Sequence, residues 1–573
     1  MNEVEKLYEL WLEKTAGNKE IHDELVSVKG NNEEILDRFY RNLEFGTAGL
    51  RGVLGAGTNR MNVFTVNQAT QGLADYLNSA FPNPSIAIAF DSRINSDVFA
   101  RDAAQVLAAN GIKVYIFREL VPTPMLSFAV RRLKCSSGVV ITASHNPAKY
   151  NGYKCYDPEG YQMTDEAAQK TYEFIQKVDI FDGVKSVDFD KAVSEGKISY
   201  IDNGIIEEFY QRVLTQQINP GICEKSELKV FYTPLNGTGN KPVREVLRRI
   251  GLKDVSVVPE QEKPDGNFPT CPFPNPEIRQ AFECALKMTK KEMADLLLAT
   301  DPDCDRVGIA VLDKGEYKLL SGNEVGALLT EYILSSRRAQ GKMPEKPIVV
   351  KSFVTTPLIT EIAAKYGCEV FDLLTGFKYI GELITKLEKA GEESRFVIGM
   401  EESYGYLAGV HARDKDAVVA SMLICEMAAY YKSLGKTLVE VMEGIYEEYG
   451  MYLADLLNFA FEGASGMQKM KDIMDSLRAN APKRIAGMEV LTVADYQEGY
   501  AEDTRTGSRK NIDLPRSNVL SYKLPGGSTV IVRPSGTEPK IKVYITAVAQ
   551  GREKAAALSS AIGADMKKMM GIS

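Results

Sequence analysis

The sequence has little of several residue types on which whole classes of protein depend. Its 573 residues include eight cysteines, three histidines and one tryptophan. No two cysteines form a Cys-x-x-Cys pair, so neither a zinc site built on thiolates nor a disulfide framework is indicated. This scattered use of cysteine is typical of a reducing compartment, and we expect a cytoplasmic protein.

Long apolar runs and blocks of basic residues are missing as well. No apolar run approaches the roughly 18 residues that a membrane helix needs, and the opening MNEVEKLYELWLEK indicates an acidic amphipathic helix instead of a signal peptide. The 77 aspartates and glutamates outnumber the 69 lysines and arginines, which gives a net charge of −8. We therefore expect no membrane and no nucleic acid as partner, and an anionic ligand would have to be attracted by local residues. A monomer and a dimer both remain open.

The composition that remains is that of an ordinary globular protein, with 44% hydrophobic and 25% charged residues. This length allows roughly three to five domains. Apolar runs of β type alternate with helical periodicity, which predicts an α/β fold. Polar or glycine-containing stretches indicate boundaries that divide the chain into domains 1–205, 206–320, 321–450 and 451–573.

Four of the predicted strands end in loops rich in hydroxyls, carboxylates or glycine. The strand runs are SGVVITA, ADLLLAT, RFVIGM and STVIVRP, and the loops that follow them begin SHNP, DPDCDR, EESYGY and SGTEP. Ligands of α/β proteins bind beyond the carboxyl ends of the strands. We therefore expect four domains, each of which offers one loop to a shared cleft.

The first loop, residues 142–147, carries Ser144 at the end of a buried strand. It lacks both glycines of the Gly-x-Ser-x-Gly elbow, and His145 is an awkward position for the base of a hydrolase triad. A serine that carries a phosphoryl group fits better, with Lys149 and Lys154 as nearby basic groups. An ordinary Ser/Thr turn before a helix is the alternative.

The second loop alternates three carboxylates, at Asp301, Asp303 and Asp305. Two carboxylates about 4 Å apart repel by about 4 kcal/mol at an effective dielectric constant of 20, and a hard cation such as Mg²⁺ or Ca²⁺ removes that repulsion. An EF-hand is excluded, because Arg306 stands where glycine is required and a strand precedes the loop. Cys304 is a poor ligand for Mg²⁺ and is expected to point away. A solvated acidic turn is the alternative.

The third loop, residues 399–405, places Glu401 and Ser403 two residues apart. In an extended segment such residues point to the same side, so they are predicted to bind neighbouring hydroxyls of a polyol while Glu402 faces away. A helix N-cap is the alternative.

The fourth loop, residues 533–540, has the chemistry of a phosphate site. It combines the guanidinium of Arg533, the hydroxyls of Ser535 and Thr537, and Gly536, which lets backbone amides approach an oxyanion. It is not a Walker loop, because the GK[ST] ending is absent. A β-hairpin turn is the alternative. Taken together, the four loops indicate phosphoryl transfer on a sugar phosphate.

These four loops, in this order, and the segment FGTAGLRG at residues 45–52 resemble the α-D-phosphohexomutase family. The resemblance covers roughly residues 40 to 550. It implies three mixed α/β domains and a smaller C-terminal α+β domain around one cleft. DPDCDR, TGFKYIG and GMEESYGY are most similar to the phosphoglucomutase branch, which includes phosphopentomutase-like members.

The resemblance also implies roles for individual residues. Ser144 would carry the phosphoryl group, and it would share Mg²⁺ with Asp301, Asp303 and Asp305. The residues implied in catalysis beside Ser144 are His145 and Lys154, for proton transfer, and Arg51 and Arg306, which would flank the phosphoserine. The residues implied in sugar binding are Thr375, Gly376, Glu401 and Ser403. Those implied at the phosphates are Lys415, Arg533, Ser535, Gly536 and Thr537.

The reaction implied is reversible conversion of α-D-glucose 1-phosphate and glucose 6-phosphate. Phospho-Ser144 would donate its phosphoryl group, and glucose 1,6-bisphosphate would be both intermediate and primer. The bisphosphate would turn around in the cleft before returning its other phosphate. Closure of the last domain would keep water out.

Several alternatives stay open at this point. Within enzymes they are a phosphopentomutase, a phosphomannomutase and a glucose 1,6-bisphosphate synthase. The phosphomannomutase reading is disfavoured because Tyr404 and Gly405 follow Ser403, where a typical bacterial phosphomannomutase has Ser-Gly-His. A silenced relative that only binds sugar phosphate as a regulator would be expected to lose Ser144 or an aspartate of the second loop, and none is missing. Trp11 is expected to have only a packing role.

Overall fold

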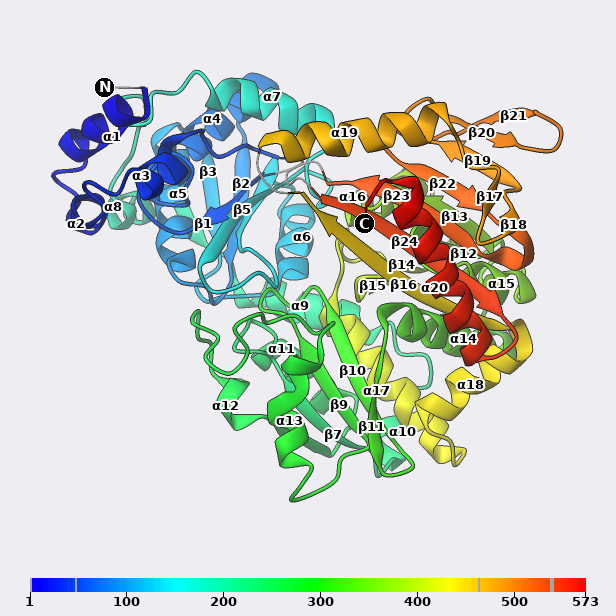
Figure 1. Cartoon of the computed structure of the whole chain (residues 1–573). Helices are drawn as coiled ribbons and strands as arrows, with labels where there is room; N and C mark the ends of the chain where they lie inside the picture. The colour runs from blue at the N-terminus through cyan, green and yellow to red at the C-terminus, as the bar shows by residue number, and fades with distance from the viewer. Residues whose placement is uncertain (1–2, 47–48, 462–463, 536–539, 573) are drawn as a thin grey trace. The chain divides into compact units, whose positions relative to one another are not determined.

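The computed structural model describes residues 3–46, 49–461, 464–535 and 540–572 (Figure 1). The chain divides into two compact units, which are described separately. The first comprises Met1–Ser321, Phe377–Gly399 and Ser403–Gly435, and the second comprises Gly322–Gly376, Met400–Glu402 and Lys436–Ser573.

Three short helices open the first unit: α1 (Glu3–Lys14), α2 (Lys19–Ser27) and α3 (Asn32–Phe39). Asparagine side chains cap two of them, since Asn18 accepts from the backbone N–H of Ile21 and Asn31 from that of Glu34. Trp11 is fully buried and meets three aromatic rings edge-on, those of Phe39, Phe64 and Phe181. The predicted packing role of Trp11 is confirmed.

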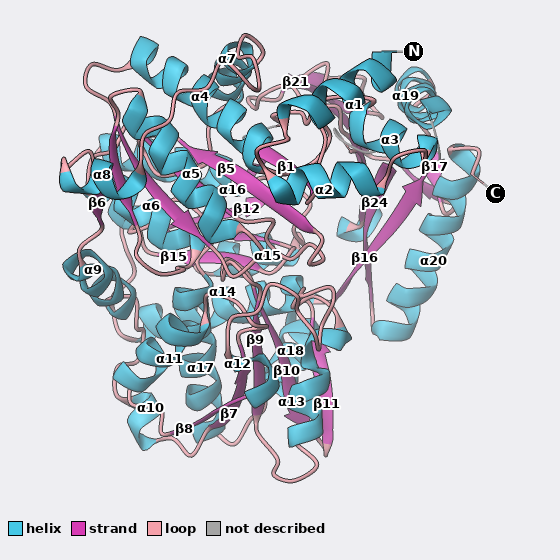
Figure 2. Ribbon diagram, turned by 90° about the vertical axis from the view of Figure 1, so that its left-hand side faces the viewer, coloured by secondary structure: helices cyan, strands magenta, loops and turns pink. Residues whose placement is uncertain are grey.

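A six-stranded sheet follows, in the order β1-β5-β4-β2-β3-β6. Its strands are β1 (Gly49–Val53), β2 (Ser85–Phe90), β3 (Lys113–Ile116), β4 (Ser137–Ile141), β5 (Tyr150–Tyr156) and β6 (Ile198–Tyr200). The helices of this part are α4 (Val63–Ala80), α5 (Ser96–Ala109), α6 (Thr123–Arg132), α7 (Asp165–Ile175) and α8 (Phe189–Ser194). Helices α5 and α6 pack against β2 and β4. Figure 2 shows both helices beside the strands of this part. Strands β2 and β4 are parallel neighbours, so the loops that follow them emerge at the same edge of the sheet.

The second sheet of this unit has five strands in the order β11-β10-β9-β7-β8. They are β7 (Lys229–Thr233), β8 (Asp254–Val257), β9 (Leu296–Thr300), β10 (Val307–Asp313) and β11 (Glu316–Leu320). The helices are α9 (Asn203–Leu214), α10 (Ile222–Lys225), α11 (Asn240–Arg249), α12 (Pro259–Glu262), the 3₁₀ helix η1 (Arg279–Phe282) and α13 (Glu283–Met288), followed later in the chain by α16 (Phe377–Lys389), η2 (Glu393–Arg395) and α17 (Ala417–Ser433). Strands β9 and β10 are antiparallel, and their connection is the DPDCDR loop.

A four-stranded sheet has the order β13-β12-β14-β15. The strands are β12 (Ile348–Ser352), β13 (Glu369–Leu373), β14 (Phe396–Glu401) and β15 (Gly405–Ala408), and the helices of the second unit in this part of the chain are α14 (Gly322–Ala339), α15 (Leu358–Lys365) and α18 (Leu438–Tyr449). Strands β12 and β13 run parallel.

The C-terminal part of the second unit is an antiparallel sheet of seven strands, in the order β16-β24-β23-β22-β19-β20-β21. The strands are β16 (Met451–Ala460), β19 (Thr492–Asp495), β20 (Tyr500–Asp503), β21 (Arg509–Asn511), β22 (Leu520–Lys523), β23 (Thr529–Pro534) and β24 (Lys540–Ala549). A small two-stranded sheet, β17 (Arg484–Ile485) with β18 (Met488–Glu489), accompanies α19 (Ala464–Ala479), η3 (Pro525–Gly527) and α20 (Arg552–Met569). The expected fold class, with three mixed α/β sheets and a C-terminal α+β domain, is confirmed.

A membrane span needs a helix that is both long and apolar. Within the described ranges no single helix satisfies both, and α17 and α18 satisfy them only together, as a bent pair. All but four residues of α17, those at its C-terminal end, are buried inside the protein.

The carboxyl group of Asp102, on α5, is predicted to make the free energy of unfolding depend on pH. Burial raises the pKa of Asp102, on α5, to about 6. The folded state therefore binds this proton more tightly than the unfolded state, and the stabilisation is lost as pH rises from about 4 to about 6. Over that pH interval the free energy of unfolding of Asp102→Asn should rise by about 1 to 2 kcal/mol relative to that of the native chain. The figure is lowered for the partial exposure of the group.

Unfolding followed by urea titration at several pH values measures this difference, in which the other carboxyl groups cancel. Asp97→Asn, at an exposed position of the same helix, is the matched control and should show no such gain. A constant difference between Asp102→Asn and the native chain from pH 4 to pH 7 would contradict the prediction.

Candidate functional site

Ser144 lies in the loop that joins β4 to β5. Its side chain is almost completely buried, and its Oγ donates to Asp301 Oδ2 at 3.0 Å. Its backbone has a φ of 52°, in the left-handed region that residues other than glycine seldom adopt. Its N–H donates to Thr142 Oγ1 at 2.8 Å, so the loop does contain a Ser/Thr turn. The alternative of such a turn before a helix is wrong in one respect, because the strand β5 follows.

His145 approaches Ser144 although the two are adjacent in sequence. Its Nδ1 lies 3.2 Å from Ser144 Oγ, and its ring meets Phe273 edge-on at 5.8 Å. The adjacency that argues against a hydrolase triad does not prevent this contact. Burial lowers the pKa of His145 well below its ordinary value, and the positive charges of Arg306 and Arg51 lower it further. The neutral imidazole can accept a proton at neutral pH.

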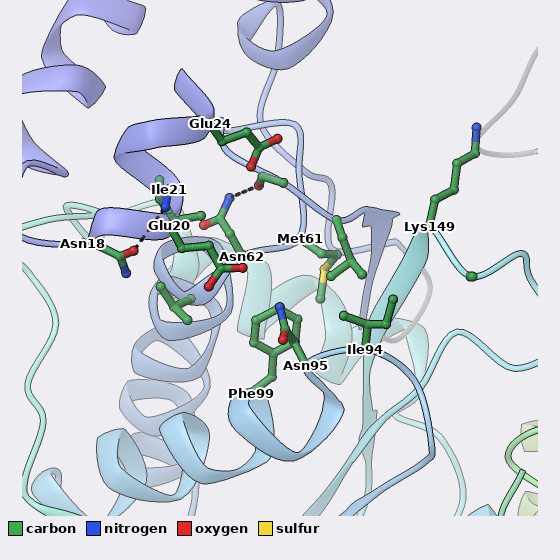
Figure 3. A pocket seen from close by; sticks show the side chains of 14 residues that line it. Asn18, Glu20, Ile21, Glu24, Met61, Asn62, Ile94, Asn95, Phe99 and Lys149 are labelled. Atoms are coloured by element: carbon green, nitrogen blue, oxygen red, sulfur yellow. Dashed lines mark hydrogen bonds between the residues drawn. The ribbon is translucent and has the colours of Figure 1, made fainter. Parts of the chain in front are cut away.

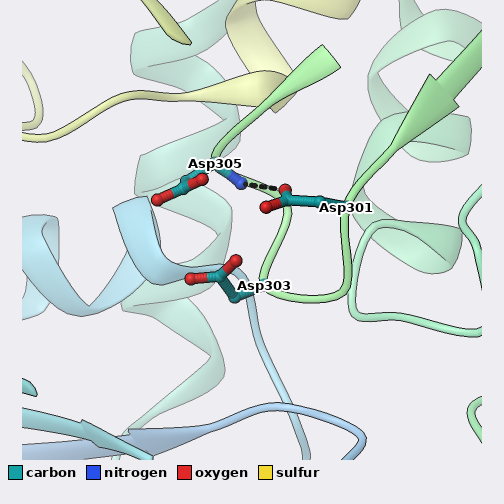
Figure 4. Close-up of side chains that lie close together, drawn as sticks. All are labelled: Asp301, Asp303 and Asp305. Atoms are coloured by element: carbon teal, nitrogen blue, oxygen red, sulfur yellow. Dashed lines mark hydrogen bonds between the residues drawn. The ribbon is translucent and has the colours of Figure 1, made fainter. Parts of the chain in front are cut away.

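The aspartates of the DPDCDR loop converge (Figure 4). Asp301, Asp303 and Asp305 are buried, and each offers a carboxylate oxygen within 4.8 Å of the other two. Asp301 Oδ1 accepts from the backbone N–H groups of Asp305 and Arg306, which closes the loop. The solvated-turn alternative is therefore wrong. The thiol of Cys304 is buried beside Thr300 and not among the carboxylates, as predicted.

Two lysines contact these carboxylates. Lys154 Nζ lies 3.0 Å from Asp303 Oδ2, and Lys415 Nζ lies 3.2 Å from Asp305 Oδ2. Burial, and then the charges of the other two aspartates, raise the pKa of Asp301. Burial acts in the same sense on Asp303, but the charge of Lys154 and the hydrogen bonds with Lys154, Asp301 and Thr123 together hold that pKa low.

The carboxylate cluster fits a hard divalent cation. Among the described residues, no group donates a hydrogen bond to Asp303 Oδ1 or Asp305 Oδ1, although both atoms are buried. Both oxygens are therefore left to bind a cation, since Arg306 Nε approaches Asp305 Oδ1 only to 3.8 Å. Oxygen ligands without sulfur or nitrogen suit Mg²⁺ or Ca²⁺.

The two arginines predicted near Ser144, Arg51 and Arg306, both lower the pKa of the adjacent His145. Arg306 Nη1 pairs with Glu277 Oε1 at 2.8 Å, and its charge reaches His145. Arg51 lies on β1, opposite Gly152 of β5, and its charge acts on His145 as well. Both guanidinium groups thus contribute positive potential beside Ser144.

The loop at residues 399–405, predicted to bind sugar hydroxyls, is not the extended segment that the prediction assumed. Glu401 ends β14, residues 402–404 form a turn, and Tyr404 has a φ of 64°. The argument from an extended segment therefore does not apply to Glu401 and Ser403, and the helix N-cap alternative is also wrong because β15 follows. Glu402 accepts from Ser352 Oγ at 3.1 Å, in keeping with a structural role.

Within the first unit, the turn that contains Ser403 is hydrogen-bonded to the end of the DPDCDR loop, called the metal loop below. The N–H of Val307 donates to the carbonyl of Tyr404, and Arg306 forms a β-bridge with Gly405. A Cβ at Gly405 would lie 2.2 Å from the Lys415 side chain, so only glycine allows that lysine to pass.

The remaining predicted site residues lie in the second unit. Glu401 Oε1 accepts from the N–H of Gly376 at 2.7 Å. The adjacent Thr375 has a buried hydroxyl with no hydrogen-bond partner among the described residues. The structure therefore brings Thr375, Gly376 and Glu401 together.

The predicted phosphate loop connects β23 to β24. Arg533 stands opposite Lys542 in the register of these antiparallel strands, and the N–H of Ser535 donates to the carbonyl of Lys540. Gly536 and Thr537 lie outside the described residues. Strands β23 and β24 pair antiparallel on either side of this loop, as the hairpin alternative requires, and the turn itself lies outside the described residues. Tyr544, on β24, hydrogen-bonds Arg533, and burial together with Glu402 raises the pKa of its phenol to about 12.

Sequence reasoning missed several residues that orient the site. Thr123 donates to Asp303 Oδ2, and Asp414 accepts from both Lys415 Nζ and Tyr156 Oη. Nothing in their local sequence marks them. Asp91 and Arg93 support the Ser144 loop and carried a signal, because the polar segment DSR follows a buried strand.

A pocket of about 370 Å³ lies elsewhere in the first unit (Figure 3). Side chains of α2, of the loop before α4 and of the start of α5 line it, and none of the predicted site residues does. Lys149 is among its lining residues and lies over the ring of Tyr150. Of the two lysines expected near Ser144, only Lys154 contacts the carboxylates.

Comparison with known families covers nearly the whole chain. Models of the phosphoglucomutase/phosphomannomutase family match in order: alpha/beta/alpha domain I at residues 42–180, domain II at 207–315, domain III at 321–449 and the C-terminal domain at 457–560. The chain belongs to the phosphoglucomutase/phosphomannomutase family of enzymes.

Individual relatives agree with this assignment. The chain is 37% identical to a phosphoglucomutase of Staphylococcus saprophyticus over 505 residues, 88% of this chain and 90% of the relative. It is 37% identical to a phosphoglucomutase of Staphylococcus aureus strain MRSA252 over 547 residues, 94% of this chain and 95% of the relative.

Two solved structures share the fold. One is a phosphoglucomutase/phosphomannomutase family protein of Burkholderia thailandensis, with a TM-score of 0.66, 19% identity and coverage of 92% and 97% of the two chains. The other is the open form of pp63/parafusin from Paramecium, with a TM-score of 0.68, 17% identity and coverage of 93% and 96%.

The carboxylate cluster predicts how the protein binds a divalent cation. Asp303→Asn should weaken the binding of Mg²⁺ at least tenfold, because it removes one of three charges that face the cation. Isothermal titration calorimetry with Mg²⁺ measures the affinity directly. Asp313→Asn, a buried and ion-paired aspartate at the far end of β10, is the matched control and should bind Mg²⁺ as the native chain does. Equal affinities in all three proteins would reject the cluster as a cation site.

Proposed function

We propose that this chain is a phosphoglucomutase, which interconverts α-D-glucose 1-phosphate and glucose 6-phosphate through phospho-Ser144. The observation that carries the proposal is the contact of Ser144 Oγ with Asp301, at 3.0 Å, inside a cluster of three buried carboxylates. A serine at a cation site is placed to receive a phosphoryl group. The 37% identity to phosphoglucomutases over most of the chain supports glucose phosphates as the substrates.

In this proposal Asp301, Asp303 and Asp305 would bind Mg²⁺ together with an oxygen of phospho-Ser144. The bound ion would offset negative charge on the transferring phosphoryl group. Arg51 and Arg306 would add positive charge from the side of His145. Phosphoryl transfer needs mainly this neutralisation and alignment, since the group requires little other chemical assistance.

Proton transfer falls to two neighbours of Ser144. When the bisphosphate gives a phosphoryl group to Ser144, the serine O–H loses its proton and the sugar oxygen gains one. His145 Nδ1 lies 3.2 Å from Ser144 Oγ, and the neutral imidazole would take the serine proton when the O–H turns from Asp301 to this nitrogen. Lys154, beside Asp303, is placed to supply a proton to the sugar oxygen.

Substrate binding falls to the other loops. Thr375, Gly376, Glu401 and Ser403 would contact sugar hydroxyls, Lys415 would lie near a substrate phosphate, and Arg533, Ser535, Gly536 and Thr537 would bind the phosphate that does not react. The last four residues form the proposed phosphate cradle. This cradle must accept either end of the sugar, because glucose 1,6-bisphosphate turns around between the two transfers. The same bisphosphate would act as primer by phosphorylating Ser144.

The proposal includes four domains, 1–205, 206–320, 321–450 and 451–573, each of which contributes a loop to one cleft. The matched ranges of the four family models fall inside these boundaries. A small sugar phosphate is the proposed partner and the cytoplasm the proposed location.

The test of the proposal is a coupled assay with α-glucose 1-phosphate, Mg²⁺ and a trace of glucose 1,6-bisphosphate. The native chain should form glucose 6-phosphate, and Ser144→Ala should lose activity at least about 10³-fold because no other side chain carries the phosphoryl group. Ser79→Ala, at an exposed position of α4, is the control. Substantial activity of Ser144→Ala would reject phospho-Ser144, whereas turnover of mannose or ribose 1-phosphate alone would replace the substrate.

The phosphate cradle gives a separate prediction. Arg533→Ala should raise the KM for glucose 1-phosphate at least tenfold, since it removes the guanidinium that would pair with the non-reacting phosphate. Arg509→Ala, an exposed arginine of the same sheet paired with Glu502, should leave the KM as it is. Steady-state kinetics of the two variants decide the matter, and an Arg533→Ala enzyme with native KM and kcat would exclude the cradle.

A further inference from the structure

A buried ion pair lies against the loop that carries Ser144. Asp91 and Arg93 have fully buried side chains, and Arg93 Nε lies 3.3 Å from Asp91 Oδ2. Both residues follow β2, the parallel neighbour of β4, so their loop and the Ser144 loop leave the sheet at the same edge. Neither residue has a role in the chemistry proposed above.

Arg93 fixes the carbonyl groups of the Ser144 loop. Its Nη1 donates to the carbonyls of Pro147 and Tyr150, at 3.1 and 3.0 Å, and its Nη2 donates to those of Ser144 and Asn146. Four bonds of this kind from one side chain need a planar fork of N–H groups, which arginine has and lysine lacks.

Asp91 fixes the N–H of Ser144, through the hydroxyl of Thr142. Its Oδ2 accepts from Thr142 Oγ1 at 2.6 Å, and Thr142 Oγ1 in turn accepts from the N–H of Ser144 at 2.8 Å. Asp91 Oδ1 accepts from Ser96 Oγ at 2.8 Å, which orients the carboxylate. Both the N–H and the carbonyl of Ser144 are thus bound, directly or through Thr142, to one ion pair.

The hydrogen bonds from Arg93 and Thr142 restrain the backbone conformation of Ser144. Its left-handed conformation, with a φ of 52°, is unfavourable for serine and persists only where surrounding bonds determine it. The same conformation accompanies the contacts of Ser144 Oγ with Asp301 and His145. The ring of Phe268 covers the Arg93 guanidinium, 5.1 Å away, and shields the ion pair from water.

We propose that Asp91, Arg93 and Thr142 are positioning residues for phosphoryl transfer, which hold Ser144 in the left-handed conformation that directs its Oγ to Asp301 and His145. The inference rests on the proposed function of Ser144. These three residues touch neither substrate nor cation, and they act on the reaction through the backbone of the serine.

Thr142 offers the cleanest test, because valine keeps its shape and serine keeps its hydroxyl. Thr142→Val should lower kcat for glucose 1-phosphate tenfold to a hundredfold, since small displacements of a reacting group cost that much. The KM should stay within about twofold and the Mg²⁺ affinity should not change. Thr142→Ser should restore kcat to within about threefold of the native value. Thr171→Val, which removes an equally buried hydroxyl on α7, should keep the native kcat.

Phosphate on Ser144 is measured in parallel, by mass spectrometry after incubation with glucose 1,6-bisphosphate, and should appear in Thr142→Val correspondingly more slowly. Three results would overturn the proposal: native kcat in Thr142→Val, no recovery in Thr142→Ser, or an equal loss in Thr171→Val. If Ser144→Ala stays active, the proposed function fails and the positioning role with it. If Ser144→Ala is inactive and Thr142→Val is native, only the positioning role fails.

Discussion

The crowding of three buried carboxylates is the constraint on which the site depends. Asp301, Asp303 and Asp305 lie within 4.8 Å of one another, out of contact with water, and like charges in such a place repel strongly. Lys154 and Lys415 offset part of this repulsion from two sides. The repulsion that remains is what a divalent cation would relieve, and Ser144 Oγ lies beside the same cluster. The loops that carry Ser144 and Lys415, both far from residues 301–305 in the sequence, meet at this cluster.

Three of the predicted site loops each contain a residue other than glycine in the left-handed conformation. Ser144, Cys304 and Tyr404 each stand at such a point, in the serine, metal and sugar loops. This conformation costs energy, and rigid surroundings maintain it. At Ser144 these surroundings are the ion pair of Asp91 and Arg93 and the hydroxyl of Thr142. At Ser144 the strain thus lies at the residue whose side chain must be directed to Asp301 and His145.

The sequence allowed prediction of what depends on local pattern. Buried strands followed by polar loops, as at residues 137–144 and 294–306, determine the α/β class, the strand ends and the chemistry of each loop. The same pattern failed where the chain turns sharply. The contact of His145 with Ser144 depends on the backbone of the loop between β4 and β5, and the turn at 402–404 breaks the period of two that was applied to Glu401 and Ser403.

Residues that support the site from a distance in sequence were beyond such reasoning. Thr123 reaches Asp303, and Asp414 reaches Tyr156, only because the chain folds, over separations of 180 and 258 residues. Tyr544 reaches Arg533 only across two paired strands. Register and tertiary packing determine these contacts, and a single sequence does not encode them in any short motif.

The kinetic competence of phospho-Ser144 is the central claim, and a single-turnover experiment tests it most directly. The chain is first phosphorylated with glucose 1,6-bisphosphate, freed of it, and then mixed rapidly with glucose 1-phosphate in the presence of Mg²⁺. Phosphate on Ser144 is followed over time by quenching and mass spectrometry. The account predicts that phosphate leaves Ser144 and glucose bisphosphate appears at a rate at least equal to kcat. Loss of phosphate slower than kcat, or turnover with Ser144 unphosphorylated throughout, would contradict it.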